Sequence, residues 1–170
     1  MENANYSAIP EVPSEISATK VLVRLIDGLG FRYSWATHGI KEEMADYRPV
    51  EGSMSVREVS IHIHDLIKRT YLTFGGEDME FDYDDSFVGL RESTLDLVDK
   101  ARNLLVAMDD NQLKNCNYYR KKTDSSYPFW YLVNGPIADI LTHIGQILTW
   151  RRMAGFPQQK GVDVFLGEKF

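Results

Sequence analysis

The sequence predicts an all-α protein, a four-helix bundle, and three observations support this fold class. Four long segments repeat apolar residues at helical spacing, no segment shows a strand signal of comparable strength, and glycines, prolines and polar residues separate the segments. The chain has 170 residues, of which 44% are hydrophobic and 26% charged, as in an ordinary globular domain. We therefore expect a single domain over residues 1–170, with helix packed against helix.

The N-terminal part combines an arm and the first helix. Residues 1–13 hold two prolines and no helical period, so we expect an extended N-terminal arm. The hydroxyl of Ser14 can cap a helix over residues 15–40. Gly28 and Gly30 each weaken this helix by about 1 kcal/mol relative to alanine, and they indicate a kink or a close contact. The apolar stripe of the helix is Val21, Leu22, Leu25, Ile26, Leu29 and Trp35.

The second and third helices are separated by an acidic segment. The second helix is predicted to begin at Ser53 or Ser55 and to end near Phe74, where two glycines follow. Residues 77–85 are acidic and are expected to form a loop, and the third helix is predicted over residues 86–109. Each of the two helices has an apolar stripe on one face, so each is expected to bury that face in the core.

The segment 111–133 shows no clear helical period. It gathers aromatic rings around a proline, and so many rings are costly to leave in water. We therefore predict a long, ordered aromatic loop before the last helix, which either covers a pocket or packs over the end of the bundle. The rings are those of Tyr118, Tyr119, Tyr127, Phe129, Trp130 and Tyr131.

The last helix is predicted over residues 136–154, with a proline in its first turn and a Gly-Phe-Pro sequence after its end. Beside its apolar stripe, four polar or aromatic residues share a neighbouring face: Asp139, His143, Gln146 and Trp150. Small residues cover another side and allow a second helix to approach closely, so the polar face is expected to point into a cavity. We expect the cavity wall to include Trp130, Tyr131 and Trp150.

Asp139 and His143 are the most informative pair in the chain. They stand four residues apart on one helix, so their side chains leave the same face roughly 6 Å apart, close enough to share a metal ion. A third ligand is available from the second helix, in His62 or His64, which lie on opposite flanks of that helix and cannot both readily join one site. Two imidazoles and a carboxylate suit a divalent transition metal with open positions. The alternative is a hydrogen-bonded Asp–His pair without metal.

Composition excludes several other functions. The net charge of −6 would repel polyphosphate, so we expect no nucleic-acid partner. No stretch approaches the roughly 20 apolar residues of a membrane span, so no membrane partner is expected. The single cysteine cannot form an internal disulfide, and the first residues show no signal or transit peptide. A cytoplasmic location is the corresponding expectation.

The order of three short motifs resembles the DinB/YfiT-like superfamily of metalloproteins over most of the chain length. The motifs are Ser55-Val-x-Glu-x-x-x-His62-Ile, His143-Ile-Gly-Gln146 and Arg151-Arg-Met-Ala-Gly155-Phe-Pro157. The resemblance implies a four-helix bundle, often dimeric, in which one histidine of the second helix and a pair four residues apart in the last helix hold a metal. It thereby favours His62 over His64 and implies the ligand set His62, Asp139 and His143, although the family usually has histidine where this chain has aspartate.

The same resemblance implies a range of chemistry. Its characterised members include transferases and isomerases that use low-molecular-weight thiols, so we expect a metal-dependent enzyme that activates a thiol or water for S-transfer or hydrolysis on a small molecule. Zinc or nickel is the expected metal, with manganese or iron as alternatives. Gln146 and His64 are the expected hydrogen-bond partners of the ligands, and no catalytic residue is assigned. The alternative function is a non-catalytic homodimeric bundle that binds a small molecule or a protein.

Overall fold

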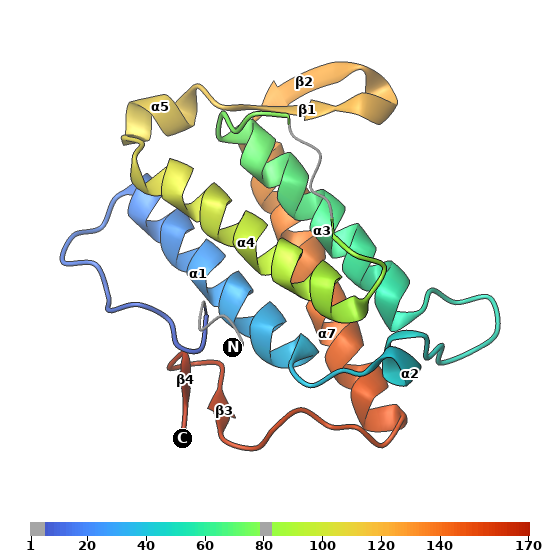
Figure 1. Ribbon diagram of the computed structural model, residues 1–170. Helices are drawn as coiled ribbons and strands as arrows, with labels where there is room; N and C mark the ends of the chain where they lie inside the picture. The colour runs from blue at the N-terminus through green and yellow to red at the C-terminus, as the bar shows by residue number, and fades with distance from the viewer. Residues whose placement is uncertain (1–5, 79–82) are drawn as a thin grey trace.

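The computed structural model describes residues 6–78 and 83–170, and within them it confirms the predicted four-helix bundle (Figure 1). Helix α4 packs against α3 and α1, and α7 packs against the same two helices from the other side. Helices α3 and α4 run in one direction, and α1 and α7 run in the opposite direction (Figure 1). The four long helices are α1 (Ala18–Thr37), α3 (Val56–Thr73), α4 (Phe87–Val106) and α7 (Ala138–Met153). A short helix, α2 (Glu42–Ala45), precedes α3.

Serine side chains set the starts of three of these helices. Ser17 caps α1, so this helix begins three residues later than predicted. Ser86 caps α4 by accepting a hydrogen bond from the backbone nitrogen of Gly89 at 2.9 Å. For α3 the structure selects Ser55, whose backbone N–H also donates to the carboxylate of Glu58 at 2.7 Å in a reciprocal capping box. Helices α1 and α4 end about three residues before their predicted ends, at Thr37 and Val106.

One hydrophobic core runs along the bundle axis. All four long helices contribute fully buried side chains to it, such as Leu29, Ile63, Leu97 and Ile144. None of the helices in the described ranges is both long enough and apolar enough to cross a membrane.

The Arg-Arg-Met-Ala-Gly-Phe-Pro motif has a structural role at the end of the bundle. Arg151 is 5% exposed, and its guanidinium donates to the backbone oxygens of Ala36 at 2.7 Å and His38 at 3.0 Å. It also donates to the backbone oxygen of Phe156 at 2.9 Å. The C-terminal carbonyls of α1 thus receive the hydrogen bonds that their own helix cannot supply. This contact fixes α7 against α1.

The prediction of a long aromatic loop is wrong, because this part of the chain has its own secondary structure. Two antiparallel strands form a hairpin in which Tyr118 faces Tyr127, and the turn between them contains Asp124 at a positive φ of 48°. Tyrosine favours strands, and aspartate tolerates the left-handed conformation, so the local signals were present. The elements are α5 (Asp110–Lys114), β1 (Asn117–Arg120), η1 (Lys121–Thr123), β2 (Ser125–Pro128) and α6 (Trp130–Leu132).

The last helix does not begin at Pro136 as predicted. A widened helical turn, η2 (Val133–Ile137), continues α6 and leads into α7. Gly135 departs from helical geometry, with φ −97° and ψ −106°, immediately before the proline. Proline has no N–H to donate to the preceding turn, so a local widening is the expected response. Helix α7 then starts at Ala138, one residue before Asp139.

The N-terminal arm and the C-terminal hairpin lie together beside α1 (Figure 1). The backbone nitrogen of Ile9 donates to the backbone oxygen of Gly167 at 2.8 Å, next to strands β3 (Val162–Asp163) and β4 (Glu168–Lys169). Tyr6 is buried against Gly30, where an added Cβ would lie 2.6 Å from the tyrosine ring. This explains one of the two glycines in α1. Residues 1–5 of the predicted arm and 79–82 of the predicted acidic loop lie outside the described residues.

Candidate metal centre

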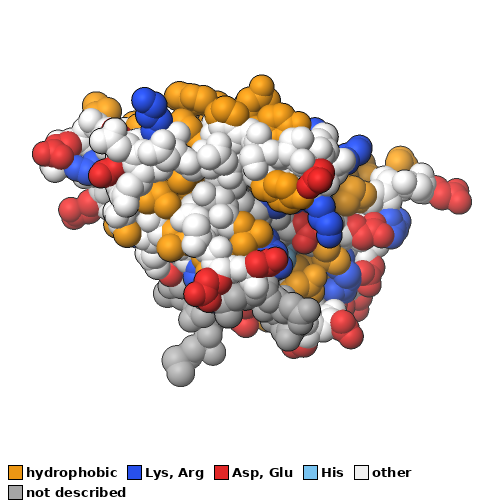
Figure 2. All heavy atoms as spheres, turned by 90° about the horizontal axis from the view of Figure 1, so that it is seen from above, with side chains coloured by type: hydrophobic (Ala, Val, Ile, Leu, Met, Phe, Trp, Pro, Cys, Tyr) orange, Lys and Arg blue, Asp and Glu red, His pale blue; other side chains and the backbone are white. Residues whose placement is uncertain are grey.

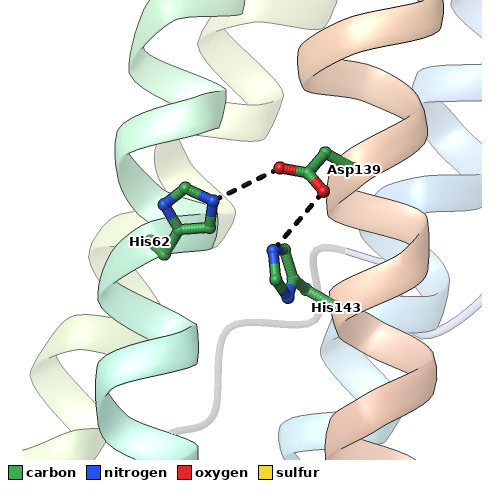
Figure 3. A group of neighbouring side chains, drawn as sticks. All are labelled: His62, Asp139 and His143. Carbon is green, nitrogen blue, oxygen red and sulfur yellow. Dashed lines mark hydrogen bonds and ion pairs between the residues drawn. The ribbon is translucent and has the colours of Figure 1, made fainter. Parts of the chain in front are cut away.

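Helix α3 supplies the first residue of the site. The capping box at Ser55 and Glu58 fixes the start of the helix, and His62 follows two turns later. Its side chain is 39% exposed and points toward α7 (Figure 3). His62 Nε2 lies 3.3 Å from Asp139 Oδ2, within hydrogen-bond distance.

Helix α7 supplies the other two residues, one turn apart. The second carboxylate oxygen of Asp139, Oδ1, lies 3.5 Å from Nε2 of His143, so the carboxylate faces both imidazoles (Figure 3). The rings of His62 and His143 are perpendicular, with centroids 4.8 Å apart. One possible ligand atom from each of the three residues lies within 4.8 Å of the others. The structure therefore brings together the three predicted ligands from two distant segments.

Gln146 determines which nitrogen of His143 is available. His143 Nδ1 lies 2.8 Å from Gln146 Oε1, and because an amide oxygen only accepts, Nδ1 carries the hydrogen and donates it. In a neutral ring Nε2 then has a lone pair, and it faces Asp139 Oδ1, which is also an acceptor. Two facing acceptors repel each other unless a cation, a proton or a metal ion, lies between them. Gln146 therefore has the position predicted for it, beside the imidazole of His143.

The group opens onto a cavity of about 640 Å³, which His62 and Asp139 help to line. Tyr131 also lines it, as predicted. The prediction that Trp130 and Trp150 belong to the cavity wall is wrong, because neither residue lines the cavity. Trp130 instead borders an apolar groove against α1, because the helical turn of α6 directs it to the other side from Tyr131, and Trp150 packs against the core.

Two solved structures share this architecture. YfiT from Bacillus subtilis, described as a probable metal-dependent hydrolase with an unusual four-helix bundle topology, superposes with a TM-score of 0.64 and 18% identity over 89% of this chain and 99% of YfiT. The DinB-like protein YjoA from Bacillus subtilis has a TM-score of 0.60 and 16% identity, over 82% of this chain and 99% of YjoA. The fold is the DinB/YfiT-like bundle. No family model matches the sequence, and the comparison with curated proteins gives no match.

The donor atoms of this DinB/YfiT-like bundle fit a metal ion. A tetrahedral ion with ligand bonds of about 2.0–2.2 Å holds its donors about 3.3–3.6 Å apart. Asp139 Oδ2 lies 3.3 Å from His62 and Oδ1 lies 3.5 Å from His143, so each carboxylate oxygen has this spacing from one imidazole. With one atom taken from each residue, the three donors lie within 4.8 Å of one another, slightly wider than a bound ion would hold them. The Asp139 side chain is 46% exposed, so solvent or a substrate can reach the group from the cavity. When the imidazole of His143 is neutral, its Nε2 and Oδ1 of Asp139 are both acceptors, and a cation between them would satisfy both.

His64 does not take part in this group of the DinB/YfiT-like bundle. It is 4% exposed and points toward α4, where its Nδ1 lies 3.1 Å from Oγ1 of Thr94. Its ring also lies edge-on to that of Tyr83. The prediction that His64 supports the ligands is therefore wrong, because a two-residue step turns a side chain by about 200° around a helix.

Sequence reasoning missed the two arginines that line the cavity, Arg69 and Arg120, and it named the lining residues Tyr118 and Tyr127 only as part of the aromatic segment. A signal for Arg69 was present, since His62, Leu66 and Arg69 are spaced so as to share one helical face, and all three line the cavity. The hairpin residues could not be placed in the same way. Their position depends on β1 lying against α3, which is a long-range contact.

Proposed function

We propose that this protein is a divalent-metal-dependent enzyme that acts on a small molecule, with His62, Asp139 and His143 as the metal ligands. One observation carries the proposal: the two oxygens of the Asp139 carboxylate face imidazole nitrogens of His62 and His143 at 3.3 Å and 3.5 Å, beside an open cavity. The four long helices enclose a continuous hydrophobic core, so the folded bundle does not need the ion for its architecture.

The three ligands and Gln146 each have a defined part in this proposal. His62 and His143 present neutral imidazole nitrogens, Asp139 adds the negative charge, and Gln146 keeps the His143 ring in the required tautomer. When bound, a divalent ion supplies Lewis acidity, which makes water or a thiol available as a nucleophile near neutral pH. The cavity has room for one small molecule beside the ligands. We propose hydrolysis first, because YfiT is described as a probable metal-dependent hydrolase, and transfer to a low-molecular-weight thiol second.

The donor set limits the choice of metal. Two imidazoles with one carboxylate suit zinc in hydrolytic sites and iron in other sites, and imidazoles also suit nickel. The oxygen donor of Asp139 admits manganese as well. We propose zinc or nickel as the physiological ion, with manganese or iron as the alternatives.

The test is elemental analysis of protein purified without added metal, followed by assays after loading with each of the four ions. We expect about one equivalent of a single divalent ion, and ester hydrolysis or thiol transfer that depends on it. His143→Ala should lose both the ion and the activity. Arg152→Gln, an exposed change on the same helix outside the cavity, is the matched control and should keep both. A wild-type protein that binds none of the four ions would overturn the proposal.

A non-catalytic binding or interaction module is the competing function. The hydrogen bond between His62 and Asp139 favours it, since it provides a partner for each group without an ion. The same elemental analysis separates the two functions. A binding module requires no stoichiometric metal, and His143→Ala would leave ligand binding intact.

A further inference from the structure

Two arginines lie in the wall of the same cavity, and neither has an acidic partner among the described residues. Arg69 comes from α3 and Arg120 from the end of β1. No ion pair joins either side chain to an acid within residues 6–78 and 83–170. In a chain with a net charge of −6, acids are abundant, yet none of the described acids pairs with either of these two side chains.

Other arginines of the bundle show what such a side chain does when its role is structural. Arg57 pairs with Glu42 and Asp46, and Arg102 pairs with the buried Asp27. These guanidinium groups hold elements of the fold together. Arg69 and Arg120 make no comparable contact, so their charges are available to a molecule in the cavity.

The rest of the lining adds no competing negative charge. Asp139 is the one acid among the described lining residues, and its two oxygens already face the imidazoles of His62 and His143. The other polar lining groups are neutral: three tyrosines, Asn134 and Thr142. The cavity therefore contains the candidate metal ligands and, separately, the positive charges of Arg69 and Arg120.

The tyrosines add flat apolar surface to the same cavity. Tyr118 and Tyr127 face each other across the hairpin, and the rings of Tyr127 and Tyr131 lie 5.0 Å apart. Seen from the hairpin end of the molecule, hydrophobic side chains, tyrosines included, are interspersed with both basic and acidic side chains on the surface (Figure 2). Aromatic faces bind the apolar or cyclic body of a ligand.

We propose that the substrate of this site carries an anionic group, a carboxylate or a phosphate, which Arg69 and Arg120 bind, and that its body packs against the tyrosines. This inference rests on the proposed function for the position of the reacting bond, beside His62, Asp139 and His143. Guanidinium groups match both anions through paired hydrogen bonds, so the shared chemistry is an oxyanion. The cavity of about 640 Å³ limits the substrate to a small molecule.

The test uses three probes of similar size in calorimetric titrations of the metal-loaded protein: phenyl phosphate, phenylacetate and the neutral 2-phenylethanol. We expect at least one anion to bind about tenfold or more tightly than the alcohol, because it gains charge-assisted hydrogen bonds. The anion that binds more tightly shows whether the site prefers a phosphate or a carboxylate. Arg69→Gln and Arg120→Gln should each lower the affinity for that anion about tenfold, while the affinity for the alcohol changes little.

Arg152→Gln again serves as the matched control, since it removes an exposed arginine outside the cavity and should leave anion binding unchanged. Three results would each overturn this inference. They are equal affinity for the alcohol and both anions, an anion affinity that is unchanged in both arginine variants, and no binding of either anion. Metal content separates it from the proposed function. Metal-free protein with arginine-dependent anion binding overturns the metal proposal alone, and metal-containing protein with arginine-independent binding overturns this inference alone.

Discussion

Two histidines on α3, only two residues apart, lie in opposite environments. His62 faces α7 and the cavity, with 39% of its side chain exposed, whereas His64 is buried against α4 and bonded to Thr94. Burial lowers the pKa of His64 and so favours its neutral form. The difference shows that the rotation of the helix, and not the residue type, decides which imidazole can bind a ligand and which one belongs to the core.

The two faces of α3 differ in the same way along their length. Toward α4 the helix is closed by tight packing, and Thr94, which meets His64, also donates to the backbone oxygen of Leu90 at 2.7 Å. Toward α7 the helix is lined by Leu66 and Arg69 and stays open to the cavity. Changes on the closed face should therefore alter stability, and changes on the open face should alter binding.

The largest effect is expected at the open face. His143→Ala removes one of three ligands, so metal affinity should fall by at least about a hundredfold, beyond the loss seen for residues that only support a ligand. The free energy of unfolding of the metal-free protein should change little, because the other packing of α7 is intact. Metal titration and urea unfolding measure the two quantities. A variant that retains wild-type metal affinity would contradict the ligand assignment.

The next effect tests the closed face. His64→Ala should lower the free energy of unfolding by about 2–4 kcal/mol, because it leaves a cavity and removes a hydrogen-bond partner of Thr94. Its metal content should stay at the wild-type value. His62→Ala is the matched change two residues away, and it should lose the metal while altering the stability of the metal-free protein by only about 0.5 kcal/mol. The reverse pattern would mean that α3 is rotated differently in solution.

A smaller effect is expected at the residue that orients His143. Gln146→Met removes the acceptor for the Nδ1 hydrogen, so metal affinity should fall about tenfold to a hundredfold. Gln146→Glu keeps an oxygen acceptor at the same place and should retain most of the affinity. Isothermal titration with zinc compares the two variants. Equal losses in both would show that the hydrogen bond does not orient the ring.

The smallest effect concerns the start of α3, on which both faces depend. The Arg48 guanidinium beside Glu58, together with the backbone N–H of Ser55, lowers the pKa of that carboxyl from 4.5 to about 2. Glu58 therefore stabilises the fold above pH 4.5, and this contribution is lost as the pH falls toward about 2. Glu58→Gln should melt at a slightly lower temperature at pH 7, and the gap to wild type should close below pH 4.5. A gap that is as large near pH 2 as at pH 7, measured by circular dichroism, would contradict the expectation.

Much of the fold was predictable, because helix signals are local. Apolar spacing identified the four long helices, and a serine at the start of α1, α3 and α4 was a usable signal even where the boundary moved by three residues, as at Ser17. The hairpin β1–β2 was not predicted. Its tyrosines were noticed as a cluster, but a strand pair this short depends on the partner strand and on α3 beneath it.

The sequence by itself determined the one-turn spacing of Asp139 and His143, the position of Gln146 one turn further along the same helix, and the helices that carry the site. These features follow from the geometry of a single helix. Helix spacing left His62 and His64 open, and the family resemblance favoured His62, which the tertiary structure places beside the pair. Only the tertiary structure decided that Arg69 and Arg120 share the cavity. The physical reason is that rotation and packing between helices arise from contacts distant in sequence, which no local pattern contains.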